Sequence, residues 1–353
     1  MSDKLLLLNL SVDSENTSLA FTQTWINELA VYYEEIDVIT LRVGEKYKVN
    51  KNVKLFSIND KNSNLSKINQ LFKLFKITRF LINNNSYQHC FAHMSPLQHL
   101  VAKYFLYKKN VKSTLWFTHI GPKFGLKWII LWFSSFLANN IVTASKNSFP
   151  FRFNNIIVTG HGILFEKFYN KKVNFIGKKF LVLSRVSKSK NIENTLENFL
   201  KIKDFKNSSI DIIGGVLNKN DEDYLNYLKD KYKVHENINF LGKKSHDSLP
   251  QIIKNYDISI NNTNKGFFDK AVLESIAAGN ICFYKSEDFN FLYSDSFTNF
   301  LLFEDNNLYK KIDLLLLQNN DSIVSEITYS QIEAEKHALN NVVLKLVTIF
   351  KTV

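Results

Sequence analysis

Short apolar runs rich in branched residues alternate with longer amphipathic stretches along the whole chain. In the first half this pattern predicts strands at residues 4–12, 36–43, 89–94, 114–119, 140–144 and 155–159. Helical periodicity lies between several of these runs, at residues 21–33, 96–109 and 126–138.

The same alternation starts again in the second half. It predicts strands at residues 179–186, 209–214, 237–242, 258–262, 281–284 and 301–303. The predicted helices are at residues 192–200, 221–232, 248–255 and 270–278, and a last one at 329–350. Strands separated by helical segments of about 10–15 residues indicate parallel sheets covered by helices on both faces, which is the α/β class.

Two such series in tandem predict two doubly wound domains that face each other. A charged stretch with little periodicity, residues 169–179, is where we expect the interdomain linker. The first domain is then 1–170, the second 171–328, and a C-terminal helix at 329–353 packs back across both. Ligands of such sheets bind beyond the carboxyl ends of the strands, so the loops there are the places to search.

The composition fits a globular protein of this size. The chain has 353 residues, of which 45% are hydrophobic and 22% charged. Cys90 and Cys282 both lie in apolar runs, where we expect buried free thiols instead of a disulfide or a zinc site. Residues 1–10 have the pattern of a first strand, interrupted by Lys4, and not that of a secretory signal.

The net charge of +12 comes mostly from lysine. The basic residues are dispersed, without an arginine-rich tract or a nucleic-acid module, so we expect no nucleic-acid partner. Anionic substrates and an acidic membrane surface both remain as explanations of the charge. The aromatic run 126–138 is shorter than the roughly 20 residues of a transmembrane helix and forms either a packed helix or an interfacial one. We expect a cytoplasmic protein, with peripheral association at the inner face of the membrane as an open alternative.

Two cations follow the first strand of the second series. The segment Ser184-Arg185-Val186-Ser187-Lys188-Ser189-Lys190-Asn191 leads from this strand into a helix. Arg185 and Lys190 therefore lie at the carboxyl edge of the sheet, ahead of the positive end of a helix, where a diphosphate can bind. A lysine-rich loop that is merely solvated is the alternative.

A second polar loop follows the strand at 258–262 and contains Gly266. It opens a helix whose first turn offers backbone N–H groups to anionic oxygens, and Glu274 lies about one turn further on. A carboxylate there can accept hydrogen bonds from ribose hydroxyls. Gly279 is a suitable C-terminal cap for this helix.

The segment Lys-Ala-Val-Leu-Glu-Ser-Ile-Ala-Ala-Gly, residues 270–279, resembles the donor-site signature of the retaining GT-B glycosyltransferases of family 4. Three further elements follow that family's order. They are Ser184-Arg185 with Lys190-Asn191, Ile212-Ile213-Gly214-Gly215, and Asn239-Phe240-Leu241-Gly242 ahead of Tyr256-Asp257. The resemblance covers most of residues 179–285 and implies the GT-B fold, with two Rossmann-like domains around a central cleft.

The resemblance also implies residue roles. Arg185 and Lys190 would bind the donor diphosphate and supply the catalytic charge, and Glu274 would bind the ribose. Backbone amides near Phe268, Asp269 and Lys270 would face the phosphate or the transferred sugar. The family usually has an acid where this chain has Gly266, and Asp269 is the candidate to replace it in donor binding.

The first half supplies candidates for the sugar and acceptor side. His119, which ends a predicted strand, matches a family histidine that touches the transferred sugar, and His93 ends another; a structural histidine is the alternative for each. The loop after the first strand lacks the family's glycine pair, so Ser14 and Asn16 are candidates for an acceptor or sugar contact. His161, in Gly160-His161-Gly162, indicates hinge geometry and not chemistry.

We therefore expect a retaining hexosyltransferase that moves a sugar from a nucleoside diphosphate sugar to an acceptor hydroxyl, in glycan, lipopolysaccharide or exopolysaccharide synthesis. The acceptor would be a glycan or a lipid-linked molecule, and neither a cofactor nor a metal is expected. A GT-B-fold nucleotide-sugar epimerase and a catalytically silent nucleotide-sugar binding protein are the alternatives. P-loop, Gly-x-Gly-x-x-Gly, Gly-x-Ser-x-Gly and His-Glu-x-x-His motifs are absent.

Overall fold

The computed structural model describes residues 3–14, 21–59, 65–118, 120–121 and 124–352. The chain forms two compact units. Unit 1 comprises Met1–Gly160 together with Leu339–Val353, and unit 2 comprises His161–Ala338. Each unit is built on a parallel sheet of its own.

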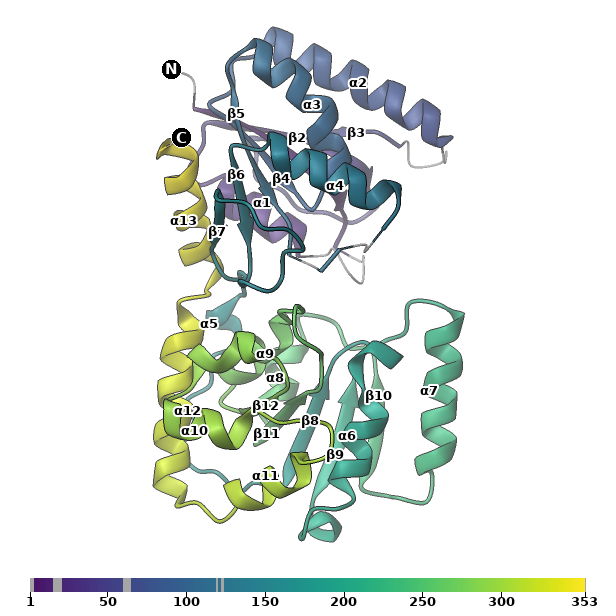
Figure 1. Ribbon diagram of the computed structural model, residues 1–353, viewed down its shortest axis with the longest axis vertical. Helices are drawn as coiled ribbons and strands as arrows, with labels where there is room; N and C mark the ends of the chain where they lie inside the picture. Colours follow the sequence, from purple (N-terminus) through teal and green to yellow (C-terminus); the bar gives the residue numbers. More distant parts are fainter. Residues whose placement is uncertain (1–2, 15–20, 60–64, 119, 122–123, 353) are drawn as a thin grey trace. The chain divides into compact units, whose positions relative to one another are not determined.

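Unit 1 has a seven-stranded parallel sheet in the order β3-β2-β1-β4-β5-β6-β7. Its strands are β1 (Lys4–Val12), β2 (Glu35–Val43), β3 (Val53–Ser57), β4 (His89–His93), β5 (Lys112–Trp116), β6 (Asn140–Thr143) and β7 (Ile156–Val158). The central strands are apolar on both sides because helices cover both faces of the sheet (Figure 1). The helices are α1 (Thr22–Leu29), α2 (Lys67–Asn84), α3 (Pro96–Lys108), α4 (Leu126–Leu137) and α13 (Leu339–Thr352).

Alternation along β1 divides the core of unit 1 into two layers. Leu6 and Leu8 pack toward α2, α3 and α4. Leu7 points the other way, toward Trp25 of α1. On that second face α13 adds Phe350, whose ring stacks on His89 at 4.6 Å between centroids. The end of the chain is therefore part of the core of unit 1.

Unit 2 has a five-stranded parallel sheet in the order β10-β9-β8-β11-β12. The strands are β8 (Lys179–Leu183), β9 (Ser209–Ile213), β10 (Ile238–Gly242), β11 (Ile258–Asn261) and β12 (Ile281–Tyr284). Its α-helices are α5 (Phe165–Phe168), α6 (Ile192–Phe199), α7 (Lys219–Tyr232), α8 (Leu249–Ile253), α9 (Lys270–Ala277), α10 (Asp295–Leu301), α11 (Leu308–Leu315) and α12 (Asn320–Glu335). Three short 3₁₀ helices are η1 (Lys188–Lys190), η2 (Phe205–Asn207) and η3 (Glu287–Leu292).

Three expectations from the sequence need correction. Residues 301–303 form no strand, because Leu301 ends α10 and only Leu302 makes an isolated bridge, to Tyr284. The predicted last helix at 329–350 is two helices, α12 and α13, which belong to different units. The units divide after Gly160, ten residues before the expected end of the first domain at 170.

The stretch predicted as an interdomain linker lies inside unit 2 and is tied to it. Asn170 N donates to Ala277 O at 3.0 Å. Lys172 pairs with the buried carboxylate of Asp257 at 2.8 Å. These contacts hold the stretch against the end of α9. Its polar residues therefore make ion pairs and hydrogen bonds within unit 2, and the stretch is not a flexible linker between the units.

Both cysteines are buried free thiols, as expected. Burial raises the pKa of each thiol to about 12, so neither is a thiolate near neutral pH. Within the described residues, no helix has the length and apolar character to cross a membrane.

Candidate functional site

The carboxyl ends of β8 and β11 lie side by side in the sheet of unit 2. β8 pairs with β9 on one side and with β11 on the other, so the strand order reverses at this point. In doubly wound sheets ligands bind beyond the strand ends where this reversal occurs. The candidate site is therefore built from the loop after β8, residues 184–191, and the loop after β11, residues 262–269.

An ion pair between Lys190 and Asp269 joins the two loops. The Lys190 ammonium group lies 2.8 Å from Oδ1 and 2.7 Å from Oδ2 of Asp269. Asp269 Oδ2 also accepts hydrogen bonds from Thr263 Oγ1 at 2.8 Å and from Asn261 Nδ2 at 2.9 Å. The Lys190 side chain is 10% exposed, so the pair is largely withdrawn from water.

The ionisation of Asp269 follows from these neighbours. Burial acts to raise the pKa of its carboxyl group. The charge of Lys190 and the hydrogen bonds from Asn261, Lys190 and Thr263 outweigh burial and hold the pKa below its ordinary value. Asp269 is thus an anion at neutral pH and compensates the charge of Lys190, so a bound diphosphate has to share Lys190 with it.

Arg185 presents the other cation of the first loop. Its side chain is exposed, and within the described part of the chain no acceptor or anion pairs with its guanidinium group. The backbone on either side is fixed, since Val186 N donates to Gly215 O at 2.9 Å. A Cβ atom on Gly214 would lie 1.7 Å from Ser184 O, so only glycine lets the loops after β8 and β9 pack this closely.

Asn191 ends the first loop in a left-handed conformation, with φ 47° and ψ 37°. Its Nδ2 donates to Asn262 O at 3.2 Å, which ties this loop to the one after β11. Asparagine tolerates this conformation far better than other side chains do. The residue therefore supplies a turn in which most other side chains would be strained.

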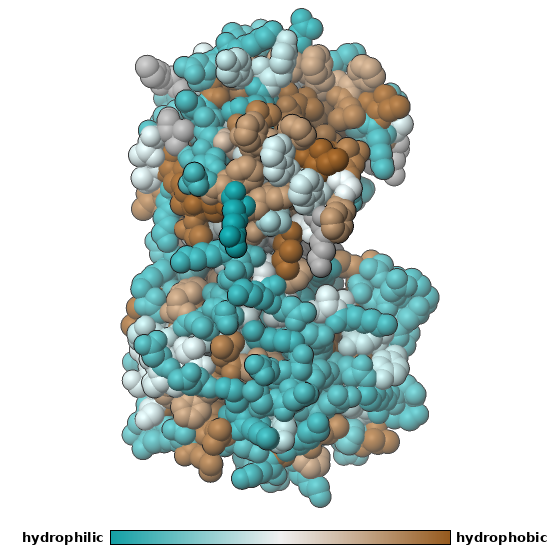
Figure 2. Space-filling model, in the orientation of Figure 1, coloured by the Kyte–Doolittle hydropathy of each residue, from teal (hydrophilic) through white to brown (hydrophobic). Residues whose placement is uncertain are grey.

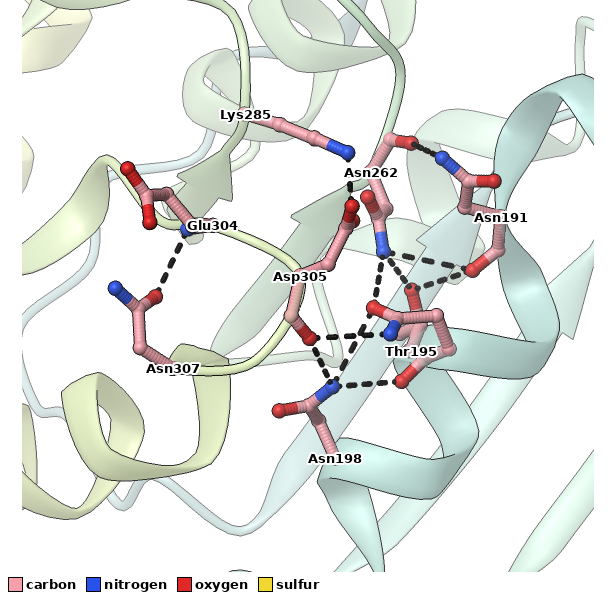
Figure 3. Close-up of polar contacts among 9 residues, drawn as sticks. Asn191, Thr195, Asn198, Asn262, Lys285, Glu304, Asp305 and Asn307 are labelled. Carbon is pink, nitrogen blue, oxygen red and sulfur yellow. Dashed lines mark hydrogen bonds and ion pairs between the residues drawn. The ribbon is translucent and has the colours of Figure 1, made fainter.

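Figure 3 shows the polar network behind this turn. Asn262 Nδ2 lies 3.0 Å from Asn194 Oδ1 and 3.3 Å from Thr195 Oγ1. One turn further along α6, Asn198 Nδ2 donates to Asp305 O at 3.0 Å (Figure 3). Helix α6, which follows the Arg185–Lys190 segment, is thereby tied near its beginning to the loop after β11 and near its end to the loop that contains Asp305.

Glu274 lies on α9, the helix that Asp269 precedes, and its side chain is buried. His246 Nε2 lies 3.6 Å from Glu274 Oε1, and the His246 ring contacts Phe168 edge to face at 5.5 Å between centroids. His246 was not among the candidates from the sequence, although it lies in the loop after β10 at the same edge of the sheet. Burial lowers the pKa of Lys270, which begins α9, and the charge of Glu274 opposes this shift.

The loop after β11, which ends at Asp269, contains Gly266. The backbone of this glycine has φ 90°. A residue with a side chain is strained in this conformation, so the glycine is explained by the turn. Phe268 is buried against Phe289 at 4.7 Å between ring centroids and against His337 at 5.8 Å. Its side chain anchors the loop, and only its backbone is left to face a ligand.

The site lies entirely within a region that matches a known family. Residues 166–332 match the model of the family Glycosyl transferases group 1. This region is a glycosyl transferases group 1 domain. It contains Arg185, Lys190, Asp269 and Glu274, and no curated protein matches the chain with significant sequence similarity.

Solved structures show that the chain has the GT-B fold, an α/β fold with two Rossmann-like domains. The chain is similar to Anabaena HepE in complex with UDP and glucose, with 13% identity, a TM-score of 0.74, and 99% of each chain covered. Sucrose-phosphate synthase from Thermosynechococcus elongatus is 11% identical, with a TM-score of 0.78 over 99% of this chain and 98% of that one. UDP-GlcNAc 2-epimerase from Methanocaldococcus jannaschii is 13% identical, with a TM-score of 0.58 over 99% of this chain and 100% of that one.

The remaining candidates lie outside the glycosyltransferase domain. His93 ends β4 and is buried between aromatic rings, with Trp25 at 5.5 Å and Trp116 at 6.0 Å between centroids. Ser14 is exposed, and its hydroxyl donates to Lys46 O at 2.8 Å. His119 and Asn16 lie outside the described residues, so their roles stay predictions.

His161, expected at a hinge, is the first residue of unit 2. It is buried, and its N–H donates to His337 Nδ1 at 3.3 Å. The glycines beside it are Gly160, with φ 86°, and Gly162. The chain thus passes from unit 1 to unit 2 at the segment that the sequence singles out.

Proposed function

We propose that this protein is a retaining glycosyltransferase that moves a hexose from a nucleoside diphosphate sugar to an acceptor hydroxyl. One observation carries the proposal. In a glycosyl transferases group 1 domain, a loop with two cations meets the beginning of the helix that carries Glu274, where the strand order of the sheet reverses. Cations and helix N–H groups suit a diphosphate, and a buried carboxylate suits the ribose hydroxyls.

In the proposed reaction the departing diphosphate is the group that most needs stabilisation, because negative charge develops on it as the sugar leaves. Arg185 would supply an exposed cation, Lys190 a cation already positioned by Asp269, and the first turn of α9 its backbone N–H groups. The diphosphate would in turn help to deprotonate the acceptor hydroxyl. With the charge supplied in this way, we propose that no metal or other cofactor is required, and that EDTA leaves transfer unchanged.

The sugar end of the donor site is proposed on different grounds. Both oxygens of Asp269 already accept bonds, from Lys190, Thr263 and Asn261. Its main role is therefore to position Lys190, and sugar hydroxyls would be met by backbone groups around Gly266 and Lys270. His93, Ser14 and, beyond the described residues, His119 and Asn16 remain candidates for sugar or acceptor contacts.

A panel of nucleoside diphosphate sugars tests the proposal, starting with UDP-glucose because similar structures contain UDP or UDP-glucose. Release of the nucleoside diphosphate is measured for the wild type and for Arg185→Ala and Glu274→Gln. Removing one donor to the developing charge typically costs about 10²–10³ in turnover, and we expect that loss for Arg185→Ala. Arg152→Ala, an exposed arginine outside the family domain, is the matched control. Full activity of Arg185→Ala would show that the donor site is wrong.

A nucleotide-sugar epimerase is the second candidate, favoured by the structural similarity to UDP-GlcNAc 2-epimerase. It would convert the donor to an isomeric nucleotide sugar without any acceptor, which NMR spectroscopy of the product detects. A silent nucleotide-sugar binding protein would instead show a ligand-induced rise in melting temperature and no product. A sugar joined to an added acceptor, with the configuration at its anomeric carbon kept, distinguishes the transferase from both.

For the acceptor we propose a glycan or a lipid-linked glycan of lipopolysaccharide or exopolysaccharide synthesis. We propose that the enzyme works in the cytoplasm, in peripheral contact with the inner face of the membrane. The net charge of +12 supports an anionic surface as partner, and no role for nucleic acid is proposed.

A further inference from the structure

The positive charge of this protein is concentrated in one part of the sequence. From Lys61 to Phe165 there are 13 lysine and arginine residues and not one aspartate or glutamate. The rest of the chain has 32 basic and 33 acidic residues and is nearly neutral. The whole net charge therefore belongs to a segment that includes α2, α3 and α4 of unit 1.

Helix α4 within this segment buries Leu131 in the core but leaves most of its other apolar side chains on the outside. Ser134 and Ser135 are fully buried, with Ser134 Oγ 2.8 Å from His99 Nδ1. On the outward face, Leu126 is 71% exposed, Phe136 61% and Phe133 48%. A helix that rests on a protein core buries its apolar residues and exposes its polar ones, so this outer face is suited to something other than water.

Helices α2 and α3 extend the same surface, because α3 contacts both α2 and α4. α2 exposes Phe72 and Phe80 together with Lys76 and Arg79. α3 adds Tyr107, which is 83% exposed. Figure 2 shows hydrophobic side chains gathered over the region of these helices, whereas hydrophilic colour dominates the face of unit 2 in the same view. We call the exposed residues of α2, α3 and α4 the α2–α4 surface.

We infer that the α2–α4 surface docks the protein on an anionic lipid bilayer. Exposed phenylalanine and leucine side chains enter the interfacial layer, while lysine and arginine beside them meet the lipid phosphates. Charge complementarity selects this occupant, since α2, α3 and α4 carry lysine and arginine but no aspartate or glutamate, and a second copy would bring the same positive charges against them. Outward leucine, isoleucine and phenylalanine have no partner in a nucleic-acid backbone. The inference rests on unit 1 alone and is independent of the proposed donor site.

Vesicle flotation tests this with the full chain and two kinds of vesicle, phosphatidylcholine alone and phosphatidylcholine with 30 mol% phosphatidylglycerol, a composition of about one anionic lipid in three. We expect binding to the anionic vesicles, little to the neutral ones, and release as salt is raised. An apolar variant, Phe133→Ser with Phe136→Ser, and a charge variant, Lys76→Glu with Arg79→Glu, should each lower the bound fraction at least tenfold. Matched variants of exposed residues in unit 2, Leu317→Ser and Lys206→Glu, should bind like the wild type.

Three results would overturn the inference. One is a wild-type protein that does not float with anionic vesicles, and another is a pair of surface variants that float as well as the wild type. The third is that the surface binds another partner and no vesicles. That partner would be either a second copy, seen in light scattering as a dimer that the apolar variant converts to a monomer, or RNA. Circular dichroism and thermal unfolding check that the variants are folded, and the half-buried Trp132, which stacks on Phe136, should report bilayer contact of the wild type by a blue shift in fluorescence.

Discussion

Asp269 bonds to Lys190 with both of its carboxylate oxygens. The change Asp269→Asn would leave the Lys190 ammonium group without its counter-charge in a site where it is 10% exposed. Removing one partner of a buried pair costs about 3–5 kcal/mol, and because Asp269 is 23% exposed we expect about 2–3 kcal/mol of unfolding free energy to be lost at pH 7. Urea unfolding followed by far-ultraviolet circular dichroism measures it.

The pH dependence of the same variant gives a second readout. The pKa of Asp269 is lowered in the folded protein, so its stabilisation is present above the ordinary pKa of the carboxyl group and is lost as pH falls through the lowered value. The difference between wild type and Asp269→Asn should therefore shrink toward pH 3. Asp305→Asn, which breaks the more exposed pair with Lys285, should cost at most about 1 kcal/mol. An equal cost for both variants would argue against a positioning role for Asp269.

Two buried histidines make unit 1 sensitive to acid. Burial, together with the charge of Lys103, lowers the pKa of His89 and of His99 to about 3 each. Both stay neutral in the folded protein but gain a proton when unfolded below their ordinary pKa of 6.5. Stability should hence fall as pH decreases from 6.5, by up to about 1.4 kcal/mol per pH unit for each histidine.

Variants of single histidines separate this effect from the general loss of stability in acid. In His99→Gln the loss of unfolding free energy between pH 6.5 and pH 4 should be smaller than in the wild type, even though Ser113 and Ser134 lose the ring as a partner. His235→Gln, at a half-buried histidine of unit 2, is the matched control. An identical dependence of the unfolding free energy on pH in the wild type and both variants would show that buried histidines do not cause the loss of stability in acid.

At the scale of elements, the connection from η1 to α6 depends on one residue. Asn191 has φ 47°, and a residue that cannot adopt this conformation costs about 1–3 kcal/mol there. The free energy of unfolding of Asn191→Gly should remain within about 1 kcal/mol of the wild type. Glycine adopts the positive φ without strain, which offsets the lost hydrogen bond to Asn262 O. Asn191→Val should lose clearly more and should weaken nucleotide binding. Thermal unfolding of the two variants measures this difference. Equal melting temperatures of Asn191→Gly and Asn191→Val would show that the turn does not require a left-handed backbone.

The contact between the loops after β8 and β9 allows an equally direct comparison. Gly214→Ala places a methyl group 1.7 Å from the backbone oxygen of Ser184, so one of the loops must move and with it Arg185. Gly215→Ala meets only the flexible side chain of Lys243, at 3.3 Å. We expect Gly214→Ala to weaken nucleoside diphosphate binding at least tenfold and Gly215→Ala to change it less than threefold, as measured by calorimetry. A reversed order would refute the packing argument.

The pattern of apolar residues predicted most elements of both sheets, because buried parallel strands are apolar on both sides and are separated by amphipathic helices. It did not predict β3, whose residues are partly exposed at the edge of the sheet, or α2, whose outward face carries phenylalanine and lysine together. The break between α12 and α13 was missed because Lys336, His337 and Ala338 continue the helical periodicity. The helix break lies where the chain passes from unit 2 to unit 1, and the local sequence does not mark it.

The candidate site was predicted in part. Strand-loop-helix order alone brings Arg185 and Lys190 to the same edge of the sheet as Glu274, since carboxyl ends of parallel strands share one edge. The ion pair of Lys190 with Asp269 joins residues 79 positions apart and depends on side-chain conformations that no local pattern encodes. His246 was missed for a similar reason, because the loop after β10 has no motif and only its place in the sheet brings it to Glu274.

At the scale of the whole molecule, the chain has two cores that different parts of the sequence complete. α13 follows unit 2 in sequence but buries Val342, Val343, Leu346 and Phe350 in unit 1. Unit 1 is therefore complete only when the end of the chain is in place. The four tryptophans, Trp25, Trp116, Trp128 and Trp132, all belong to unit 1, so tryptophan fluorescence reports on that unit alone.

Two matched core variants use this asymmetry to test the division. Leu346→Ala and Leu228→Ala each remove the same atoms from a fully buried position, the first in unit 1 and the second in unit 2. Each should cost about 2–5 kcal/mol. Leu346→Ala should lower the midpoint of the transition seen by tryptophan fluorescence while nucleotide binding, which belongs to unit 2, persists to the wild-type temperature. Leu228→Ala should do the opposite. If both variants shift both signals equally, the two units unfold as one cooperative body, and the donor site depends on the last helix of the chain as much as on its own sheet.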